Sequence, residues 1–281
     1  MDSCPTAAGW YGCPSLAAFE SDAEAYSSPP PFALLQYYLN RSQPPVYLHL
    51  LERYIEYTND TDILERAVAI GDLEMQWWDT NRSLEVTGPS GQSHFVHRYN
   101  VDTSAARPES YLEDWETVNG EVGGERLTLN TSLYSDISSG AESGMDYSGA
   151  RWFREPLAFV DDTTAALRTI NTNAQIPVDL ESILHGSYQI LARYYMRLGN
   201  QSRSDYWADR AQKSRAAVLD LHWDSEALVF KDYNMTSSSR ADIWSTAAYY
   251  PYWNNIIPSE VLSNETTAQK AFSGLAFLTA K

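Results

Sequence analysis

The sequence predicts an all-α fold built from paired helices, with small β-hairpins inserted between them. Apolar residues recur at three- and four-residue steps in several stretches, which is the spacing of one helix face. Short polar turns separate neighbouring stretches of this kind, as in αα-hairpins. Such pairs recur at intervals of several tens of residues. This recurrence predicts a curved array of helical hairpins.

The first predicted pair of helices follows Pro44 and Pro45, which suit a first helical turn. Its first helix has a broad apolar face, made by Val46, Leu48, Leu50, Leu51, Tyr54 and Ile55. A second helix is predicted from about Asp60. Its apolar face is made by Ile63, Leu64, Ala67, Ile70, Leu73 and Trp77.

A β-hairpin is predicted within residues 84–100, where two strand-like segments flank Gly88-Pro89-Ser90-Gly91. Helices resume over 126–138, 179–198 and 203–221, and Gly199 marks the end of the second of these. A small hairpin around Phe230 to Tyr233 follows, then helix-like stretches at 243–250 and 265–279. Residues 1–30 are rich in Ser, Ala, Gly and Pro and are predicted to be irregular, ahead of a helical domain over 31–281.

The composition argues against a nucleic-acid partner and against a membrane span. The formal net charge is −17 and only four lysines occur, so the phosphates of a nucleic acid would be repelled. No apolar run is long enough to cross a membrane. Aromatic residues make up 13% of the chain, but such side chains serve a core, an interface or a carbohydrate groove equally well. The sequence does not specify an oligomeric state.

Seven Asn-x-Ser/Thr sequons predict a glycosylated, secreted protein, at Asn40, Asn59, Asn81, Asn130, Asn200, Asn234 and Asn264. A surface that is merely rich in Ser, Thr and Asn is the alternative. Cys4 and Cys13 can close a small disulfide loop in an oxidising compartment. No signal peptide is visible at the start, which predicts that the natural N-terminus lies further upstream.

One acid, Asp146, lies within a segment of small and aromatic residues at 142–152, followed by Arg151 and Trp152. Carboxyl groups in apolar surroundings lose hydration, which favours the protonated form that a general acid needs. Aromatic rings and an arginine beside a carboxyl group also suit a sugar. A packed turn with no catalytic role is the alternative on these residues alone.

Two upstream segments carry polar groups held in place by proline. Arg41 and Gln43 precede Pro44 and Pro45 at a predicted helix entrance, where pre-organised donors can bind hydroxyl groups. A helix cap is the alternative there. Further on, Pro108 forces Arg107 towards extended geometry, so that Arg107 and Glu109 can point into one groove. A salt-bridged helix start is the alternative reading of that segment.

Four ordered segments resemble the α,α-trehalases: YYLNRSQPP (37–45), RPES (107–110), AESGMDYSGARW (141–152) and IPVDLESIL (176–184). The segments His222-Trp223-Asp224 and Lys231-Asp232-Tyr233 also match. The resemblance implies an (α/α)6 toroid, incomplete in this chain. It also implies inverting hydrolysis of α,α-trehalose to two glucose molecules, with no metal or organic cofactor.

The resemblance assigns the role of proton donor to Asp146. Carried over position by position, the residues that would bind the disaccharide are Arg41, Ser42, Gln43, Arg107, Glu109 and Gly144. An inverting enzyme also needs a second carboxylate, as general base, roughly 6.5–9.5 Å from the acid. Glu142, Glu113 and Asp114 are candidate secondary acids of the same region, and a solvated or paired carboxylate is the alternative for each.

The chain departs from the family pattern in several places. It resembles roughly the middle half of a trehalase, without the early PGGRF-type segment, the QWD-type segment or the late general base. We therefore expect poor turnover and poor solubility from the 281-residue chain. Met145 replaces a tryptophan, and one extra residue before Arg151 can turn that side chain away. A non-catalytic carbohydrate-binding remnant and a different toroidal glycosidase are the alternative functions.

Overall fold

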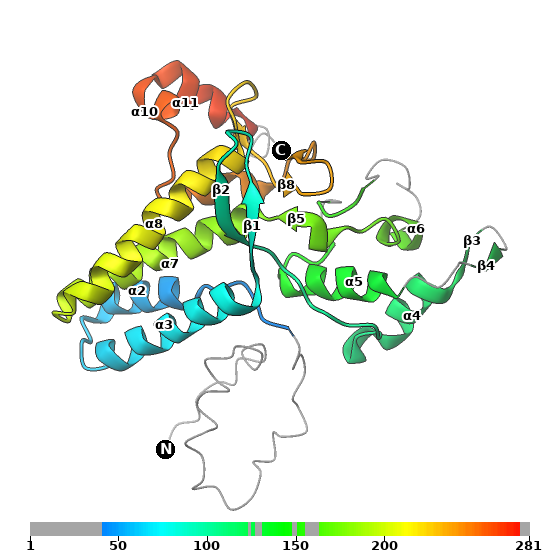
Figure 1. Ribbon diagram of the computed structural model, residues 1–281, viewed down its shortest axis with the longest axis horizontal. Helices are drawn as coiled ribbons and strands as arrows, with labels where there is room; N and C mark the ends of the chain where they lie inside the picture. The colour runs from blue at the N-terminus through cyan, green and yellow to red at the C-terminus, as the bar shows by residue number, and fades with distance from the viewer. Residues whose placement is uncertain (1–40, 123–124, 127–130, 148–150, 155–162, 276–281) are drawn as a thin grey trace, which may run out of the picture. The chain divides into compact units, whose positions relative to one another are not determined.

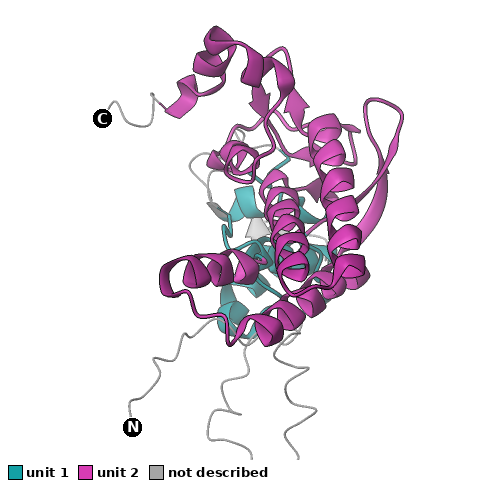
Figure 2. Cartoon of the chain, turned by 90° about the vertical axis from the view of Figure 1, so that its left-hand side faces the viewer, with its two compact units in different colours: residues 1–44, 99–173 teal, residues 45–98, 174–281 magenta. Residues whose placement is uncertain are grey.

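The computed structural model describes residues 41–122, 125–126, 131–147, 151–154 and 163–275 (Figure 1). The chain forms two compact units, each made of two separate stretches of sequence (Figure 2). Unit 1 comprises residues 1–44 and 99–173, and unit 2 comprises residues 45–98 and 174–281. The predicted boundary near residue 30, together with Cys4 and Cys13, lies outside the described residues and stays a prediction.

The first predicted helix pair is present in unit 2 as α2 (Tyr47–Thr58) and α3 (Leu64–Asn81). Helix α2 ends where Asn59 adopts a left-handed conformation with φ of 53°. The second helix begins four residues later than the sequence predicts. The Oδ1 atom of Asp60 accepts the N–H of Asp62 at 3.1 Å, and this local bond holds the chain in a turn before α3 starts.

Helices α7 (Val178–Arg197) and α8 (Gln201–Leu221) form the second predicted hairpin and lie side by side in Figure 1. Gly199 has a φ of 77° in the turn between them, which explains the glycine at that position. Asn200 then caps α8 by accepting the N–H of Arg203 at 3.1 Å.

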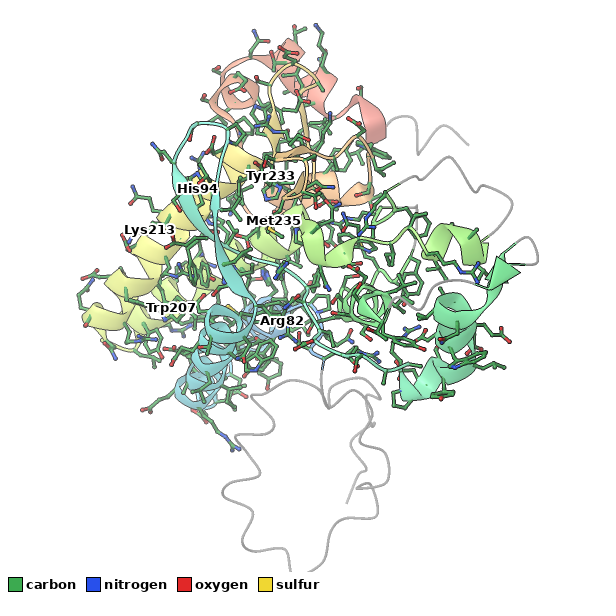
Figure 3. The ribbon with its side chains drawn as sticks, turned by 45° about the vertical axis from the view of Figure 1, so that its right-hand side comes forward. Arg82, His94, Trp207, Lys213, Tyr233 and Met235 are labelled. Carbon is green, nitrogen blue, oxygen red and sulfur yellow. The ribbon has the colours of Figure 1, made fainter. Side chains whose placement is uncertain are left out.

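The core of unit 2 surrounds α7, whose residues are buried without interruption from Val178 to Tyr188. Helices α2, α3 and α8 all pack against it. Trp207 of α8 is fully buried and stacks on Tyr188, with ring centroids 5.3 Å apart. Lys213, on the same helix, is exposed (Figure 3). One face of α8 is therefore in the core and the other is in solvent, as the periodicity predicts.

The predicted β-hairpin is formed by β1 (Ser83–Thr87) and β2 (Ser93–His97), which pair antiparallel. Its turn is attached to α8 through one carboxylate. Asp220 accepts Ser90 Oγ at 2.6 Å and lies 2.7 Å from His94 Nε2. The hairpin is therefore held against the body of unit 2, with His94 labelled in Figure 3.

The later hairpin differs from its prediction. Strands β6 (Trp223–Asp224) and β7 (Val229–Phe230) form one hairpin, while β8 (Tyr233–Asn234) and β9 (Ser239–Arg240) form a second. Strand β8 also pairs with β5 (Gln175–Ile176). Asp224 and Asn234 each accept N–H groups from the residues that follow them, which closes two separate turns.

The last predicted helices are present in shorter pieces where they are described, and residues 276–279 of the final prediction lie outside the described residues. Residues 243–250 contain η5 (Thr246–Tyr249), which leads into α9 (Tyr250–Trp253). Helices α10 (Ser259–Ser263) and α11 (Glu265–Ala271) follow. Asn264 separates them, because its side chain accepts the N–H of Thr267 and starts a new helix. None of the helices within the described ranges is long and apolar enough to cross a membrane.

Unit 1 contains η2 (Pro108–Ser110), α4 (Tyr111–Asn119), the strand pair β3 (Glu121–Val122) and β4 (Glu125–Arg126), and α5 (Ser132–Glu142). Helix α6 (Thr163–Leu167) follows, and then η4 (Thr172–Ala174), whose last residue is the first of the second stretch of unit 2. The predicted helix over 126–138 is wrong at its start. Arg126 pairs with Glu121 in the β-ladder, and the helix begins at Ser132 instead.

A buried histidine, His97, joins four elements of unit 2. The side chain is 1% exposed, with Nδ1 3.0 Å from Glu181 Oε1 on α7 and Nε2 3.0 Å from Asp79 Oδ1 on α3. Arg210 of α8 donates to the same Asp79 oxygen at 2.7 Å. Burial opposes a charge on His97, but the Glu181 and Asp79 carboxylates outweigh it and raise its pKa above the ordinary value.

The contacts of His97 with Glu181 and Asp79 should stabilise the folded protein less as the pH rises into the alkaline range. Because the folded pKa is raised, the stabilisation is complete below the unfolded pKa of about 6.5 and is lost as pH rises through the folded pKa. We expect His97→Gln to cost roughly 1–3 kcal/mol in acid and less at pH 9. Urea unfolding of both proteins across this range measures the difference.

His222 provides a control of opposite sign. It is buried, and its pKa is lowered chiefly by that burial, so the neutral form is favoured in the folded state. His222 therefore lowers the free energy of unfolding below about pH 6.5. The stability of His222→Gln relative to wild type should be higher in acid than in alkali. If the free energy of unfolding of His97→Gln differed from that of wild type by the same amount at every pH, a charge on His97 would not contribute to stability.

Candidate active site

The segment with the predicted acid forms a turn directly after α5. Ser143 caps the helix, Gly144 has a φ of 68° and Asp146 has a φ of 47°. Both values lie in the left-handed region, which glycine enters freely and which aspartate tolerates better than most residues. Residues held in this conformation concentrate at functional sites, because the surrounding structure must enforce them.

The Asp146 side chain is exposed, which differs from the apolar setting that the sequence predicts. Its neighbour Tyr147 is packed against α5 instead, where the hydroxyl donates to the carbonyl oxygen of Ile137 at 2.9 Å. Burial raises the pKa of the Tyr147 hydroxyl, so it stays protonated. Met145 is half-buried. The aromatic ring in this motif therefore supports the helix end rather than enclosing the acid.

Arg151 remains close to the motif despite the extra residue. Its Nη1 atom is 3.0 Å from the sulfur of Met145, and its guanidinium lies 4.2 Å from the ring centroid of Trp152. Arg151 is buried. The insertion therefore leaves this side chain beside the turn.

The segment at 41–44 lies against the same turn. A Cβ atom built on Gly144 would lie 3.4 Å from Pro44 Cγ and 3.8 Å from Gln43 Oε1. Gln43 itself is exposed, whereas Arg41 is 4% exposed and forms an ion pair with Glu109. Two of the predicted segments are thereby joined by one charge pair.

Arg107 has a rigid partner in Asp114 on α4. Its Nη2 and Nε atoms donate to the two carboxylate oxygens at 2.7 and 2.8 Å, and its backbone N–H donates at 2.9 Å. Burial disfavours the charge of Arg107, but the hydrogen bonds to Asp114 and its negative charge together favour that charge more strongly. The pKa of Arg107 is therefore raised. The guanidinium also lies 5.7 Å from the centre of the Tyr147 ring. The predicted extended geometry before Pro108 is confirmed by a ψ of 136° at Arg107.

The secondary acids have different surroundings. Asp114 is the partner of Arg107, and Glu113 is exposed. Glu142 is fully buried and accepts both the N–H and the hydroxyl of Ser42 at 2.8 Å. Its other oxygen accepts the N–H of Asn100 at 3.1 Å.

All seven predicted site residues belong to unit 1, and their contacts connect the segments at 41–44, 107–110 and 141–147. The sequence does not indicate Asn100, because its contribution is a backbone N–H that no side-chain pattern reveals. Asp114, a candidate secondary acid in the sequence, is the partner of Arg107 because of its position on α4. Within the described ranges no group of three His, Cys, Asp or Glu side chains is placed to hold a metal ion.

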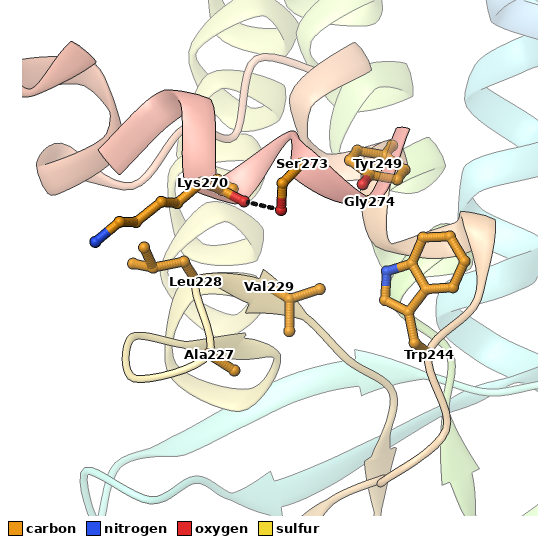
Figure 4. Close-up of a pocket in the computed structure, with 9 residues that line it drawn as sticks. Ala227, Leu228, Val229, Trp244, Tyr249, Lys270, Ser273 and Gly274 are labelled. Atoms are coloured by element: carbon orange, nitrogen blue, oxygen red, sulfur yellow. Dashed lines mark hydrogen bonds between the residues drawn. The ribbon is translucent and has the colours of Figure 1, made fainter. Parts of the chain in front are cut away.

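A separate cavity of about 310 Å³ lies in unit 2 (Figure 4). Trp244, Tyr249 and the apolar β6–β7 turn line it, and Ser273 donates to the carbonyl oxygen of Lys270 at its edge. None of the predicted site residues lines this cavity.

Comparison with known proteins finds similarity to trehalases. The trehalase family profile matches residues 31–279. The chain is 36% identical to a trehalase of Dictyostelium discoideum over 82% of this chain and 37% of that protein. It is 33% identical to a trehalase of Apis mellifera over 78% of this chain and 34% of that protein. The chain thus spans a little over one third of the length of these relatives.

Among solved structures, the neutral trehalase Nth1 from Saccharomyces cerevisiae has a similar fold. The TM-score is 0.59 at 19% sequence identity, over 84% of this chain and 44% of that chain. At this identity the likeness concerns the fold alone. It confirms the predicted class of helical hairpins with small β-hairpin insertions.

Gly144 allows a direct test of the left-handed turn. An alanine there would meet Pro44 only at ordinary contact distance, so the main cost is the backbone conformation, roughly 1–2 kcal/mol. Gly91 in the β1–β2 turn has a φ of 81° with nothing within 4 Å of a built Cβ. Gly144→Ala and Gly91→Ala should therefore lose similar stability in urea unfolding.

The two substitutions should differ in activity. Because Gly144 lies two residues before Asp146 and an added methyl group would face the 41–44 segment, Gly144→Ala is expected to lower kcat/KM about tenfold or more. Gly91→Ala should leave kcat/KM within twofold of wild type. Equal activity of the two variants would remove the turn from the site.

Proposed function

Because the chain belongs to the trehalase family, we propose that the protein to which it contributes hydrolyses α,α-trehalose to two glucose molecules. Asp146 is the general acid of this proposal. The observation that supports it is the gathering of Arg41, Glu109 and the Gly144 turn within one compact unit. The activity is that of a hydrolase that needs neither a metal nor an organic cofactor.

The proposed sugar-binding residues differ in what they offer. Gln43 is exposed and retains an amide that can exchange hydrogen bonds with hydroxyl groups. Arg41 and Arg107 carry fixed guanidinium groups, because each already pairs with a carboxylate. Pairing restricts their rotamers, so less conformational entropy is lost when a sugar binds. Ser42 and Gly144 contribute chiefly through the backbone positions of their neighbours.

An inverting mechanism also needs a general base. In this mechanism Asp146 protonates the glycosidic oxygen while a second carboxylate deprotonates a water on the opposite face of the sugar. Glu109, Asp114 and Glu142 each accept bonds from donors inside unit 1. We assign none of them as the base. In the resembled family the base follows these four segments in sequence.

Secretion and N-glycosylation complete the proposal. Asn59, Asn81, Asn200 and Asn264 are exposed at ends of helices, where a glycan can be attached without disturbing packing. Asn234 is half-buried and its side chain accepts two backbone N–H groups, so it should be the least modified of the described sites. Enzymatic removal of N-glycans should lower the mass of the protein from its native source, and an unchanged mass would contradict glycosylation.

Asp146→Asn is the sharpest test of the acid. Asparagine also tolerates the left-handed region, so the turn should persist while the transferable proton is lost. We expect trehalose hydrolysis to fall roughly 10²–10⁴-fold. Activity on α-glucosyl fluoride should fall much less, since a fluoride leaving group needs no proton. The two rates are measured on the same purified variant.

Three results would contradict the proposal. Equal losses on both substrates would show that Asp146 is not the proton donor. Calorimetric binding of trehalose without any hydrolysis by the wild type would instead favour a non-catalytic carbohydrate-binding protein. Faster cleavage of another glucoside would indicate a different glycosidase of this fold.

A further inference from the structure

Glu142 occupies a position that its own helix disfavours. It is the last residue of α5 and is fully buried. A negative charge at a helix C-terminus meets the negative end of the helix dipole. Burying a carboxylate without hydrogen-bond donors costs further free energy. Local helix stability therefore does not explain this residue, and departures of this kind concentrate at functional sites.

The contacts of Glu142 provide the explanation. Oε1 accepts from Ser42 N and Ser42 Oγ, both at 2.8 Å, and Oε2 accepts from Asn100 N at 3.1 Å. One carboxylate thus fixes the backbone of two segments that lie far apart in sequence. Hydrogen bonds to a charged acceptor are among the stronger ones in proteins, so this junction is stiff.

The segment of Ser42 and the turn that follows Glu142 both carry proposed site residues. Ser42 lies between Arg41 and Gln43. On the other side, Glu142 is followed by Ser143 and Gly144, whose turn carries Asp146. Asn100 begins a stretch that α5 also holds, since Ser139 Oγ accepts the N–H of Val101 at 2.8 Å. The distance from the sugar-binding segment to the acid therefore depends on this junction.

We propose that Glu142 is a positioning residue, which sets Asp146 against the Arg41–Gln43 segment without itself touching the substrate. This inference rests on the proposed function, because it concerns the geometry of the same site. A displacement of about 1 Å between a bound substrate and its catalytic group can cost on the order of 100-fold in rate.

Glu142→Gln tests the proposal with almost no change in volume. An amide offers one carbonyl oxygen and one NH2 group, so its NH2 must face the N–H of either Ser42 or Asn100. One of the two segments is then released. We expect kcat for trehalose to fall on the order of 100-fold, and for α-glucosyl fluoride several-fold less, because misplacing Asp146 matters only when a proton must be delivered.

Asp136 provides a matched control on the same helix. It is a buried carboxylate of α5 that accepts the N–H of Asn173 at 2.8 Å. Asp136→Asn repeats the acid-to-amide change away from the Glu142 junction. It should lower the rates on trehalose and on α-glucosyl fluoride by the same factor, as any general loss of folded structure would. If Glu142→Gln also lowered both rates by the same factor, the proposal for Glu142 would be overturned, while the role proposed for Asp146 would stand.

A second measurement does not depend on activity. Amide hydrogen exchange should quicken in peptides that contain Ser42 and Asn100 in Glu142→Gln, while peptides from α7 and α8 keep their wild-type protection. Unchanged exchange at Ser42 and Asn100 would contradict the proposal even if trehalose proved not to be the substrate. Should Glu142→Gln fail to fold, Glu142→Asp keeps both oxygens one methylene shorter and should show the same pattern more weakly.

Discussion

Buried carboxylates that need donors from elsewhere in the sequence are the constraint on which this structure depends. Taking a carboxylate out of water is costly, and the cost is recovered only when several N–H or O–H groups surround it. Asp72 on α3 accepts from Tyr195 and Arg203, on two other helices. Glu142 and Asp114 meet the same need in unit 1. Each of these acids therefore determines which segments must meet.

This constraint also explains why the site is assembled from short motifs separated by long intervals. Arg41, Glu109 and Glu142 come from three stretches of sequence, and each takes part in a bond to another of the stretches or to Asn100. Removing one partner would leave a buried charge without compensation, which is worse than losing an ordinary contact. Arg41, Ser42 and Glu142 are thus part of the packing of unit 1.

Regular elements were predictable because their signals are local. The apolar faces of α2, α7 and α8 repeat at helical spacing, and Gly199 marks the end of α7 by itself. The strand pair β3–β4 was not, because the pairing of Arg126 with Glu121 competes with helix formation only once both are close in space. Likewise, two separate turns at Asp224 and Asn234 depend on side-chain bonds that periodicity does not report.

The left-handed backbone at Asp146 has a genetic consequence. Few residues accept this conformation, and asparagine, which does, is one nucleotide away from aspartate in the genetic code. A single point mutation can therefore remove the acidic proton at almost no cost in folding. Under the proposed function, this position offers a short route to a folded protein that still binds its ligand but no longer cleaves it, wherever selection for hydrolysis is relaxed.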